Sequence, residues 1–168
     1  TLLRPGAPAE LQLGRIRRIT ADPGLEIHPA LSPDGKFVAF AAGPGGRLKI
    51  FVRQIAGGRR IAVAEDIRGD QHWPRWSPDG TRLSLEAGRG IYVVPALGGP
   101  ARLLVAPPED RSLASDDGPS YLAWSPDGRR IAYAVGRGIE VREAAGGPAT
   151  RITEADHPHS LAWSPDGS

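Results

Sequence analysis

Short apolar runs recur along the chain, and each is bounded by turns rich in glycine, proline and aspartate. Around one such turn, at residues 125–128, the run "YLAW" comes before and the run "RRIAYAV" comes after. Partial alternation of apolar and polar residues in runs this short is typical of β-strands, and no helical pattern lies between them. The pattern therefore predicts an all-β protein.

The most regular turn is a Ser-Pro-Asp-Gly motif in four copies, at residues 32–35, 77–80, 125–128 and 164–167. Proline suits the second position of a type I turn, aspartate the third, and glycine the left-handed position that follows. Each copy therefore predicts a tight hairpin with a bulge. Successive motif serines are 45, 48 and 39 residues apart, which fits propeller blades of about 40 to 50 residues.

Each period also contains a second glycine turn, a third strand, a Gly-Gly pair and a fourth strand. The repeat predicts a β-propeller fragment of three complete four-stranded antiparallel blades, with a flanking strand at each end. Three blades cannot close a propeller, which needs four to eight, so we expect a piece of a longer protein. The predicted bounds are a linker at 1–13, a partial propeller at 14–168, blades at about 27–65, 72–106 and 120–155, and flanking strands at 14–20 and 159–164.

Composition narrows the class of protein. The chain has 168 residues, of which 40% are hydrophobic and 24% charged, as in a globular domain. Lys and Arg number 21 against 19 acidic residues, so no basic footprint for nucleic acid is present. No apolar run approaches the roughly 20 residues of a membrane span. The absence of cysteine excludes disulfides, thiolate metal sites and a cysteine nucleophile.

The sequence carries no signature of an enzyme, a cofactor or a metal site. It has no G-x-S-x-G, H-E-x-x-H or P-loop motif. The motif aspartates Asp34, Asp79, Asp127 and Asp166 could be read as a carboxylate ring for a cation. We expect each instead to cap its own turn, because ligands on four blades lie too far apart to share one ion.

All four histidines, His28, His72, His157 and His159, fall four to seven residues before a motif serine. The first strand of a blade lines the central channel, so this slot is expected where the chain enters the channel. Imidazole there would suit a pH-sensitive mouth that binds a ligand. The alternative is that these residues end a loop and form local hydrogen bonds. His28 and His72 are expected on adjacent blades without facing one another.

Insertions point to one face of the propeller. The first blade has extra residues at 44–47, and the second has a long exit at 107–120. Strand alternation places both, with the histidine slot, opposite the Ser-Pro-Asp-Gly turns. Binding sites usually sit on variable loops of a rigid scaffold.

The charges on this face are candidates for partner binding. Arg89 and Arg137 occupy equivalent turns and could meet an acidic partner, although such residues often only solubilise a surface. The exit loop, which also contains Arg111, carries a local charge of −3 and is either a solvated loop or a binding loop. Its acidic residues are Glu109, Asp110, Asp116 and Asp117.

The stretches "PRWSPDGTRL" with "GIYVVPALGG", and "LAWSPDGRRIAY" with "GIEVREAAGG", resemble the TolB-like, or WD-like, β-propeller repeat family. The resemblance implies binding of proteins or peptides at the axial mouth, as in the periplasmic Tol-Pal system. It also allows a gating domain of a prolyl-oligopeptidase-like peptidase. A further possibility is the C-terminal region of a bacterial transmembrane serine/threonine kinase, and the residues of the N-terminal part resemble this last group most. Leu31, Ser84 and Leu85 depart from the family pattern and could loosen packing between blades.

Two functions remain open. The first is a non-catalytic propeller module, a sensor or scaffold that binds a protein or peptide through the loop-variable face. The second is an accessory substrate-gating propeller of a peptidase. The resemblance implies a periplasmic or extracytoplasmic location. The exposed edges of an open propeller predict self-association or completion by further blades.

Overall fold

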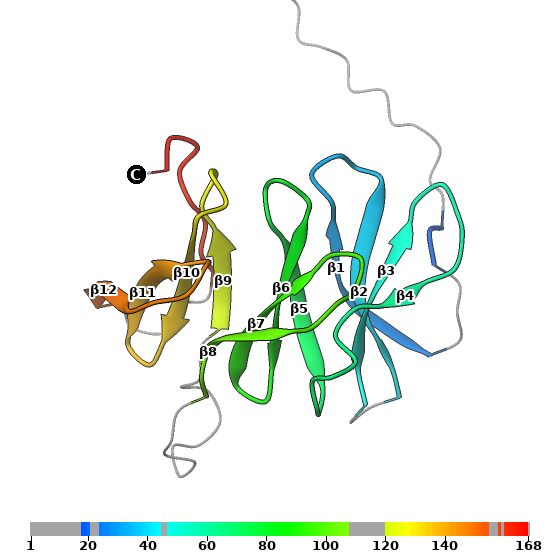
Figure 1. Ribbon diagram of the computed structural model, residues 1–168, viewed down its shortest axis with the longest axis horizontal. Coiled ribbons are helices and arrows are strands. Elements are labelled where there is room, and N and C mark those ends of the chain that lie inside the picture. Colours follow the sequence, from blue (N-terminus) through cyan, green and yellow to red (C-terminus); the bar gives the residue numbers. More distant parts are fainter. Residues whose placement is uncertain are drawn as a thin grey trace, which may run out of the picture.

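The computed structural model describes residues 18–20, 24–44, 47–107, 120–154, 158 and 160–167. They form three four-stranded antiparallel sheets, each a meander in chain order, so the predicted all-β fold of three blades is confirmed (Figure 1). Blade 1 comprises β1 (Leu25–Leu31), β2 (Phe37–Gly43), β3 (Lys49–Gln54) and β4 (Ile61–Ala62). Blade 2 comprises β5 (Gln71–Trp76), β6 (Arg82–Ala87), β7 (Gly90–Pro95) and β8 (Arg102–Val105). Blade 3 comprises β9 (Ser120–Trp124), β10 (Arg130–Val135), β11 (Gly138–Glu143) and β12 (Ala149–Glu154).

The Ser-Pro-Asp-Gly turns are built alike and lie along the upper edge of the view in Figure 1. In the first copy the Ser32 hydroxyl donates to the Asp34 carboxylate at 2.6 Å, and the Lys36 amide donates to the same oxygen at 3.1 Å. These bonds, the serine's first, hold the pKa of Asp34 below its ordinary value. Gly35 has a φ of 68°, a left-handed conformation that glycine adopts without a steric penalty. The aspartates therefore cap their turns, as predicted.

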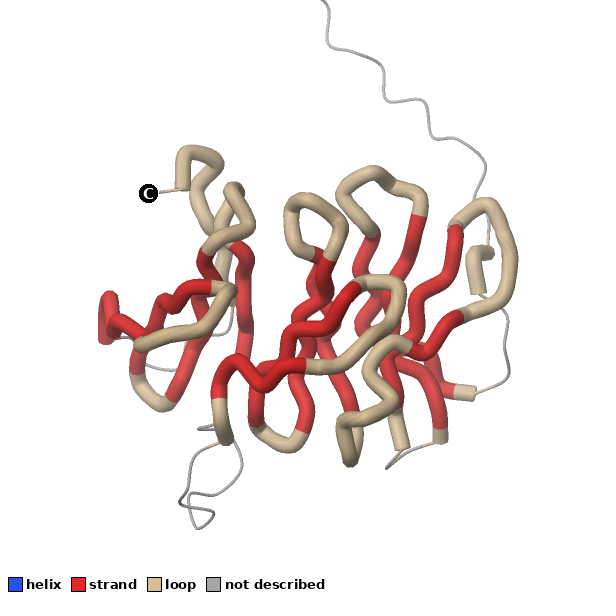
Figure 2. Tube along the Cα trace, viewed as in Figure 1, coloured by secondary structure: helices blue, strands red, loops and turns tan. Residues whose placement is uncertain are grey.

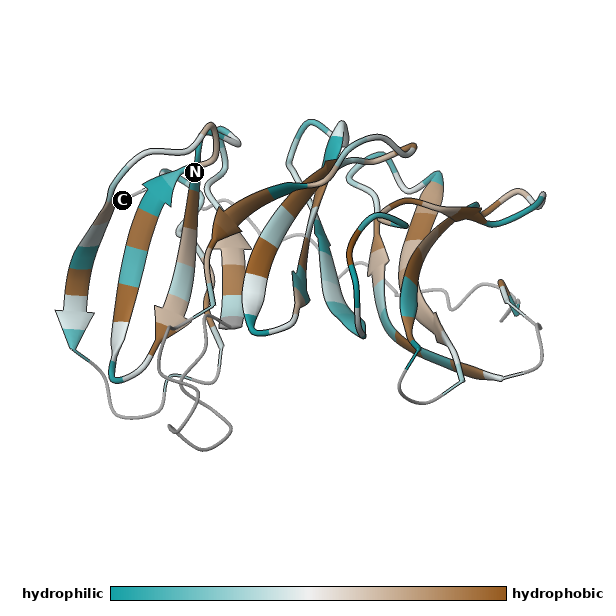
Figure 3. Cartoon of the chain, turned by 60° about the horizontal axis from the view of Figure 1, so that its bottom comes forward, coloured by the Kyte–Doolittle hydropathy of each residue, from teal (hydrophilic) through white to brown (hydrophobic). Residues whose placement is uncertain are grey.

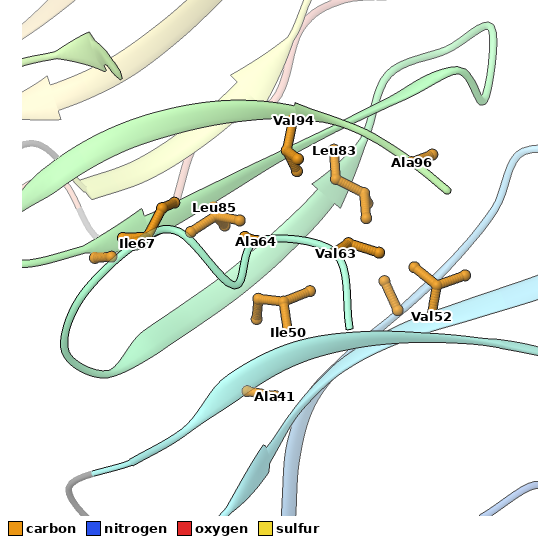
Figure 4. Packing of buried hydrophobic residues seen from close by; sticks show 12 residues of the cluster. Ala41, Ile50, Val52, Val63, Ala64, Ile67, Leu83, Leu85, Val94 and Ala96 are labelled. Carbon is orange, nitrogen blue, oxygen red and sulfur yellow. The ribbon is translucent and has the colours of Figure 1, made fainter. Parts of the chain in front are cut away.

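Adjacent blades are joined by apolar side chains from facing strands. Between blades 1 and 2, Ile50, Val52, Leu83 and Leu85 are at most 1% exposed (Figure 4). A second cluster, which includes Tyr133, joins blades 2 and 3. Figure 3 shows apolar positions alternating with polar ones along the strands of neighbouring sheets, and the apolar positions supply these contacts.

The motif tryptophans link the segment that carries them to the preceding blade. The Trp76 indole donates to the Ala30 carbonyl at 3.0 Å, and the Trp163 indole donates to the Ala123 carbonyl at the same distance. The Trp124 indole instead donates to the Ser84 hydroxyl at 2.9 Å. Of the three departures from the family pattern, Ser84 and Leu85 are fully buried, whereas Leu31 is 61% exposed.

The flanking strands expected at 14–20 and 159–164 are not formed in their described parts. Residues 18–20 and 160–164 have no ladder partner, although Ile19 packs against blade 1. A strand needs a hydrogen-bonded neighbour, and none of the described strands pairs with them. Figure 2 shows strands and loops throughout, and no helix long and apolar enough to cross a membrane occurs in the described ranges.

Candidate binding site on the inner strands

The first strand of every blade contains a β-bulge at the same position. Ladder pairing slips between Ile27 and Ala30 in β1, between His72 and Arg75 in β5, and opposite Ala132 and Ala134 in the pairing of β9 with β10. The first bulged residues have left-handed backbones, with φ of 54° at His28, 51° at Trp73 and 49° at Tyr121. Such strain in residues other than glycine is uncommon and is found at functional sites. Because it recurs in three blades, this position is a candidate functional site.

The bulges bring His28, His72 and Trp73 into contact. The His28 ring stacks on the Trp73 ring, with centroids 3.5 Å apart, and meets the His72 ring edge-on at 5.5 Å. The prediction that the two histidines do not face one another is therefore wrong, because their rings meet across the interface of adjacent blades. Burial, then the charges of His72 and Arg75, hold the pKa of His28 below its ordinary value. This environment thus favours the neutral form of His28.

Two large aromatic side chains of these strands remain open to solvent. Trp73 is 42% exposed and Tyr121 is 44% exposed. The guanidinium of Arg75, which is itself exposed, lies 6.0 Å from the centre of the Trp73 ring. Exposed aromatic rings beside a guanidinium offer stacking and hydrogen bonding at one place, the combination that is enriched at the centres of protein interfaces.

Glu86 is a candidate residue that sequence reasoning missed. It lies in β6 as the ladder partner of His72, and its carboxyl accepts a hydrogen bond from the backbone amide of Tyr121 in blade 3. Burial raises its pKa to about 7, and the hydrogen bond and the charge of Arg75 act in the opposite direction. The signal was present in the repeat, because the positions nine residues after the motif serines of blades 1 and 3 are Ala41 and Ala134.

We call these residues together the inner-strand cluster, and it extends across all three blades. Glu86 connects the Tyr121 backbone with Arg75 and His72, and these two residues lie beside His28 and Trp73. A raised carboxyl pKa and a lowered imidazole pKa at one place are typical of functional sites. Its members are His28, His72, Trp73, Arg75, Glu86 and Tyr121.

The other predicted site residues lie elsewhere. Arg89 and Arg137 occupy the β6–β7 and β10–β11 turns, at the opposite end of the blades from the Ser-Pro-Asp-Gly turns (Figure 1). Arg89 has a left-handed backbone, with φ of 64°, and its Nε and Nη2 atoms are buried without a hydrogen-bond partner. Among the described residues no group of three or more acidic or histidine side chains could hold a metal ion. Six further predicted site residues lie outside the described residues, namely Glu109, Asp110, Asp116, Asp117, His157 and His159.

Solved structures similar to this chain are propellers. Putative TolB from Agrobacterium tumefaciens superposes with a TM-score of 0.68 and 27% identity, over 90% of this chain and 54% of that chain. TolB from Acinetobacter baumannii gives a TM-score of 0.68 at 23% identity, over 89% and 37% of the two chains. The chain is a β-propeller region similar to TolB.

Curated relatives match shorter stretches of this TolB-like propeller. A protein TolB homolog of Chlorobium chlorochromatii is 29% identical over 86 residues, which are 49% of this chain and 19% of the relative. A protein named methionyl-tRNA formyltransferase, of Desulforamulus reducens, is 40% identical over 74 residues, which are 44% and 20% of the two chains. The chain thus spans about a fifth of these relatives' length. No family model matches it, and these relatives do not support the predicted kinase parent.

Proposed function

We propose that this TolB-like propeller is a non-catalytic module that binds a protein or peptide partner at the inner-strand cluster. The observation that carries the proposal is the repeated bulge, which holds Trp73 and Tyr121 in left-handed conformations and leaves both rings exposed. A protein gains no stability from exposed, strained aromatic residues. Their conformation is better explained by a contact that forms outside the chain.

The charges of the cluster favour a partner that carries an acidic group beside an apolar side chain. Arg75 is exposed over Trp73, and its charge contributes to the low pKa of His28. A carboxylate of the partner could therefore pair with the Arg75 guanidinium while a neighbouring side chain stacks on Trp73. Arg89 and Arg137 would extend this preference for acidic groups toward the loop-variable face predicted from the sequence.

Peptide selection tests the proposal directly. A phage-displayed library of random peptides is panned against the protein, and the enriched peptides are synthesised and measured by fluorescence anisotropy. We expect them to share an acidic residue next to an aromatic or aliphatic one. Trp73→Ala and Tyr121→Ala should each weaken binding by about tenfold or more, as removal of a central aromatic residue does at other interfaces.

A matched control comes from the same blade. Leu97 is a large apolar residue that is 64% exposed in the turn after β7, and Leu97→Ser removes it without touching the cluster. Binding by this variant should equal that of the wild type. Peptides that bind the two aromatic variants and the wild type equally would contradict the proposal, and circular dichroism would establish that each variant is folded.

Self-association, or completion by further blades, belongs to the same proposal. Ile91 and Val93 of blade 2 are at most 6% exposed because blade 3 covers them, whereas the equivalent Ile139 and Val141 of blade 3 are only half-buried. Covering this second face would bury the same kind of apolar surface. Sedimentation velocity should show association that Val141→Glu reduces, and a wild type that stays monomeric at tens of micromolar would contradict this part. We extend the proposal to an extracytoplasmic location, in line with the similarity to TolB.

A further inference from the structure

Glu86 differs from its counterparts in the neighbouring blades in a way that the binding proposal does not use. Blades 1 and 3 have the small apolar residues Ala41 and Ala134 at this position, and both are at most 4% exposed. A carboxyl group at such a position is unfavourable unless polar groups compensate for its lost hydration. The groups that face it therefore indicate what it does.

Glu86 has neighbours in three strands, β5, β7 and β9. From β5, His72 is its ladder partner and Arg75 attracts its charged form. From β9, the Tyr121 amide donates a hydrogen bond to it. From β7, its ladder partner is the apolar Ile91. The Tyr121 amide thus contributes a hydrogen bond to Glu86, and Arg75 contributes an opposite charge.

The hydrogen bond from the Tyr121 amide links the bulge of β9 to blade 2. Ser120 and Ala123 pair with β10, and Tyr121 lies in the bulge between them. Its left-handed backbone, with a φ of 49°, is strained and persists only where the surrounding structure supports it. The Glu86 carboxyl holds the Tyr121 amide from the neighbouring blade and so favours the conformation that exposes the Tyr121 ring.

We propose that Glu86 is a positioning residue that holds Tyr121 in its exposed conformation, and that the charge state of Glu86 controls partner binding at the inner-strand cluster. The effect on binding rests on the function proposed above. A carboxylate is a stronger acceptor than a neutral carboxyl, so Tyr121 is held best when Glu86 is charged. Binding through Tyr121 is therefore strongest above neutral pH and weakens as Glu86 takes up its proton. The elevated pKa of this group, about 7, places that change within the physiological range.

The first measurement needs no partner. The amide of Tyr121 is followed by two-dimensional ¹H–¹⁵N NMR from pH 5 to pH 9. We expect a titration with a midpoint near 7 in the wild type and none in Glu86→Gln, which keeps an acceptor oxygen but cannot ionise. In His72→Gln the titration should remain, which separates Glu86 from the adjacent imidazole.

Glu140→Gln is the matched control. Glu140 is a half-buried β-strand glutamate that accepts a hydrogen bond from the Tyr133 hydroxyl at 2.9 Å. Replacing it changes a similar carboxyl in blade 3 without touching the Glu86 contact, so the Tyr121 amide should titrate as in the wild type.

The second measurement uses a peptide from the selection above. Its Kd is measured for the wild type and for Glu86→Gln at pH 6 and pH 8. Both proteins contain the same histidines, so the ratio of the two Kd values isolates Glu86. We expect a ratio near one at pH 6 and binding by the wild type about fivefold tighter at pH 8, as for replacing a charged by a neutral acceptor.

The outcomes separate this inference from the function on which it rests. A Tyr121 amide that does not titrate near neutral pH, or that titrates equally in Glu86→Gln, would overturn the positioning role even if peptides bind. A titrating amide with a Kd ratio that does not change with pH would overturn the effect on binding. Failure to select any peptide would count against the proposed function, while the NMR result would still decide the role of Glu86.

Discussion

The two interfaces between blades are built from the same repeat but are joined differently. Between blades 1 and 2 the contacts are apolar, Phe37 packs toward Trp76, and the main polar group is the fully buried Gln71. Between blades 2 and 3 the equivalent of Phe37 is Arg82, which stacks on Trp124 at 4.9 Å and donates to the Gly128 carbonyl at 3.0 Å. Glu86 adds an ionisable group to this second interface.

This difference shows that the blade repeat sets how adjacent blades pack, whereas the side chains at each interface can differ. At the first interface the buried Gln71 amide has hydrogen bonds for both its oxygen and its nitrogen, which favours rigidity there. The second contains a cation and a carboxyl group, so its strength depends on pH. The Glu86 contact therefore lies where the exposed Tyr121 is attached, and the Gln71 contact lies on the other side of blade 2.

The largest predicted effect is at the first interface, for Gln71→Ala. The Gln71 side chain accepts from the Ile50 amide at 2.9 Å and donates to the carbonyls of Ala64 at 2.6 Å and Ile67 at 3.2 Å. Removing it leaves the Ile50 amide without its acceptor and opens a cavity at a fully buried position, although the Ala64 and Ile67 carbonyls keep other donors. We therefore expect the free energy of unfolding to fall by about 4 kcal/mol. Urea denaturation measures this change.

The exposed Gln54 in β3 provides the control for that measurement. Gln54→Ala makes the same chemical change on the same pair of blades and should alter the free energy of unfolding by less than about 0.5 kcal/mol. Equal effects of the two substitutions would show that the buried amide does not fasten blade 1 to blade 2.

The next effect is at the second interface and has the opposite sign. The pKa of Glu86 is about 7 in the folded protein against an ordinary value of 4.5, so the folded state binds this proton more tightly than the unfolded chain does. The free energy of unfolding of the wild type should therefore fall as pH rises from about 4.5 to about 7, by up to about 3 kcal/mol. Glu86→Gln removes this dependence and should gain stability relative to the wild type between pH 5 and pH 8.

Urea denaturation of both proteins at pH 5 and pH 8 checks this expectation. The histidines are present in both, so their contribution cancels in the difference. A wild type and variant with parallel pH profiles would contradict it. A gain in stability on removal of Glu86 at pH 8, together with weaker binding, is the trade-off expected of a residue kept for function.

The sequence predicted the blades because their turns are local. Ser32, Asp34 and Gly35 form their turn with bonds to residues at most five positions away, so the motif alone contains the information. The expected strand at 159–164 was not formed in its described part because a strand depends on a distant partner. Local chemistry was therefore readable, whereas pairing between segments was not.

The site was only partly predictable for the same reason. The repeat register singled out His28 and His72 as candidates, but their contact depends on how two adjacent blades pack together, which no local pattern encodes. Glu86 could have been found by aligning the repeats, since a carboxyl replaces alanine there. That its acceptor role involves a backbone amide of the next blade could be seen only in three dimensions.

A moderate effect is expected for Arg82→Met, which keeps the length of the side chain but removes its charge. The variant loses the stacking on Trp124 and the bond to the Gly128 carbonyl, and we expect a loss of about 1.5 kcal/mol. Arg129→Met, at an exposed position of the same turn region, should change little. If both variants unfold at the same urea concentration, Arg82 does not join blades 2 and 3.

The smallest effect is expected for Ser84→Ala. The Ser84 hydroxyl stands between the Trp124 indole and the Arg75 carbonyl, with distances of 2.9 Å and 3.3 Å. Blades 1 and 3 have alanine at this position, Ala39 and Ala132, and the indoles that follow donate directly to the equivalent carbonyls. The Trp124 indole of the variant can therefore move to the Arg75 carbonyl, and we expect a loss of about 0.5 to 1 kcal/mol.

A double-mutant cycle with Trp124→Phe distinguishes a relay from a simple space-filling role. If Ser84 matters through the indole, Ser84→Ala should have a smaller effect when Trp124 is already phenylalanine, with a coupling energy of at least about 0.5 kcal/mol. Additive effects would mean that the hydroxyl serves only the Arg75 carbonyl. The second interface would then differ from the first through Arg82 and Glu86 alone, because the serine would not contribute to the indole contact that all blades share.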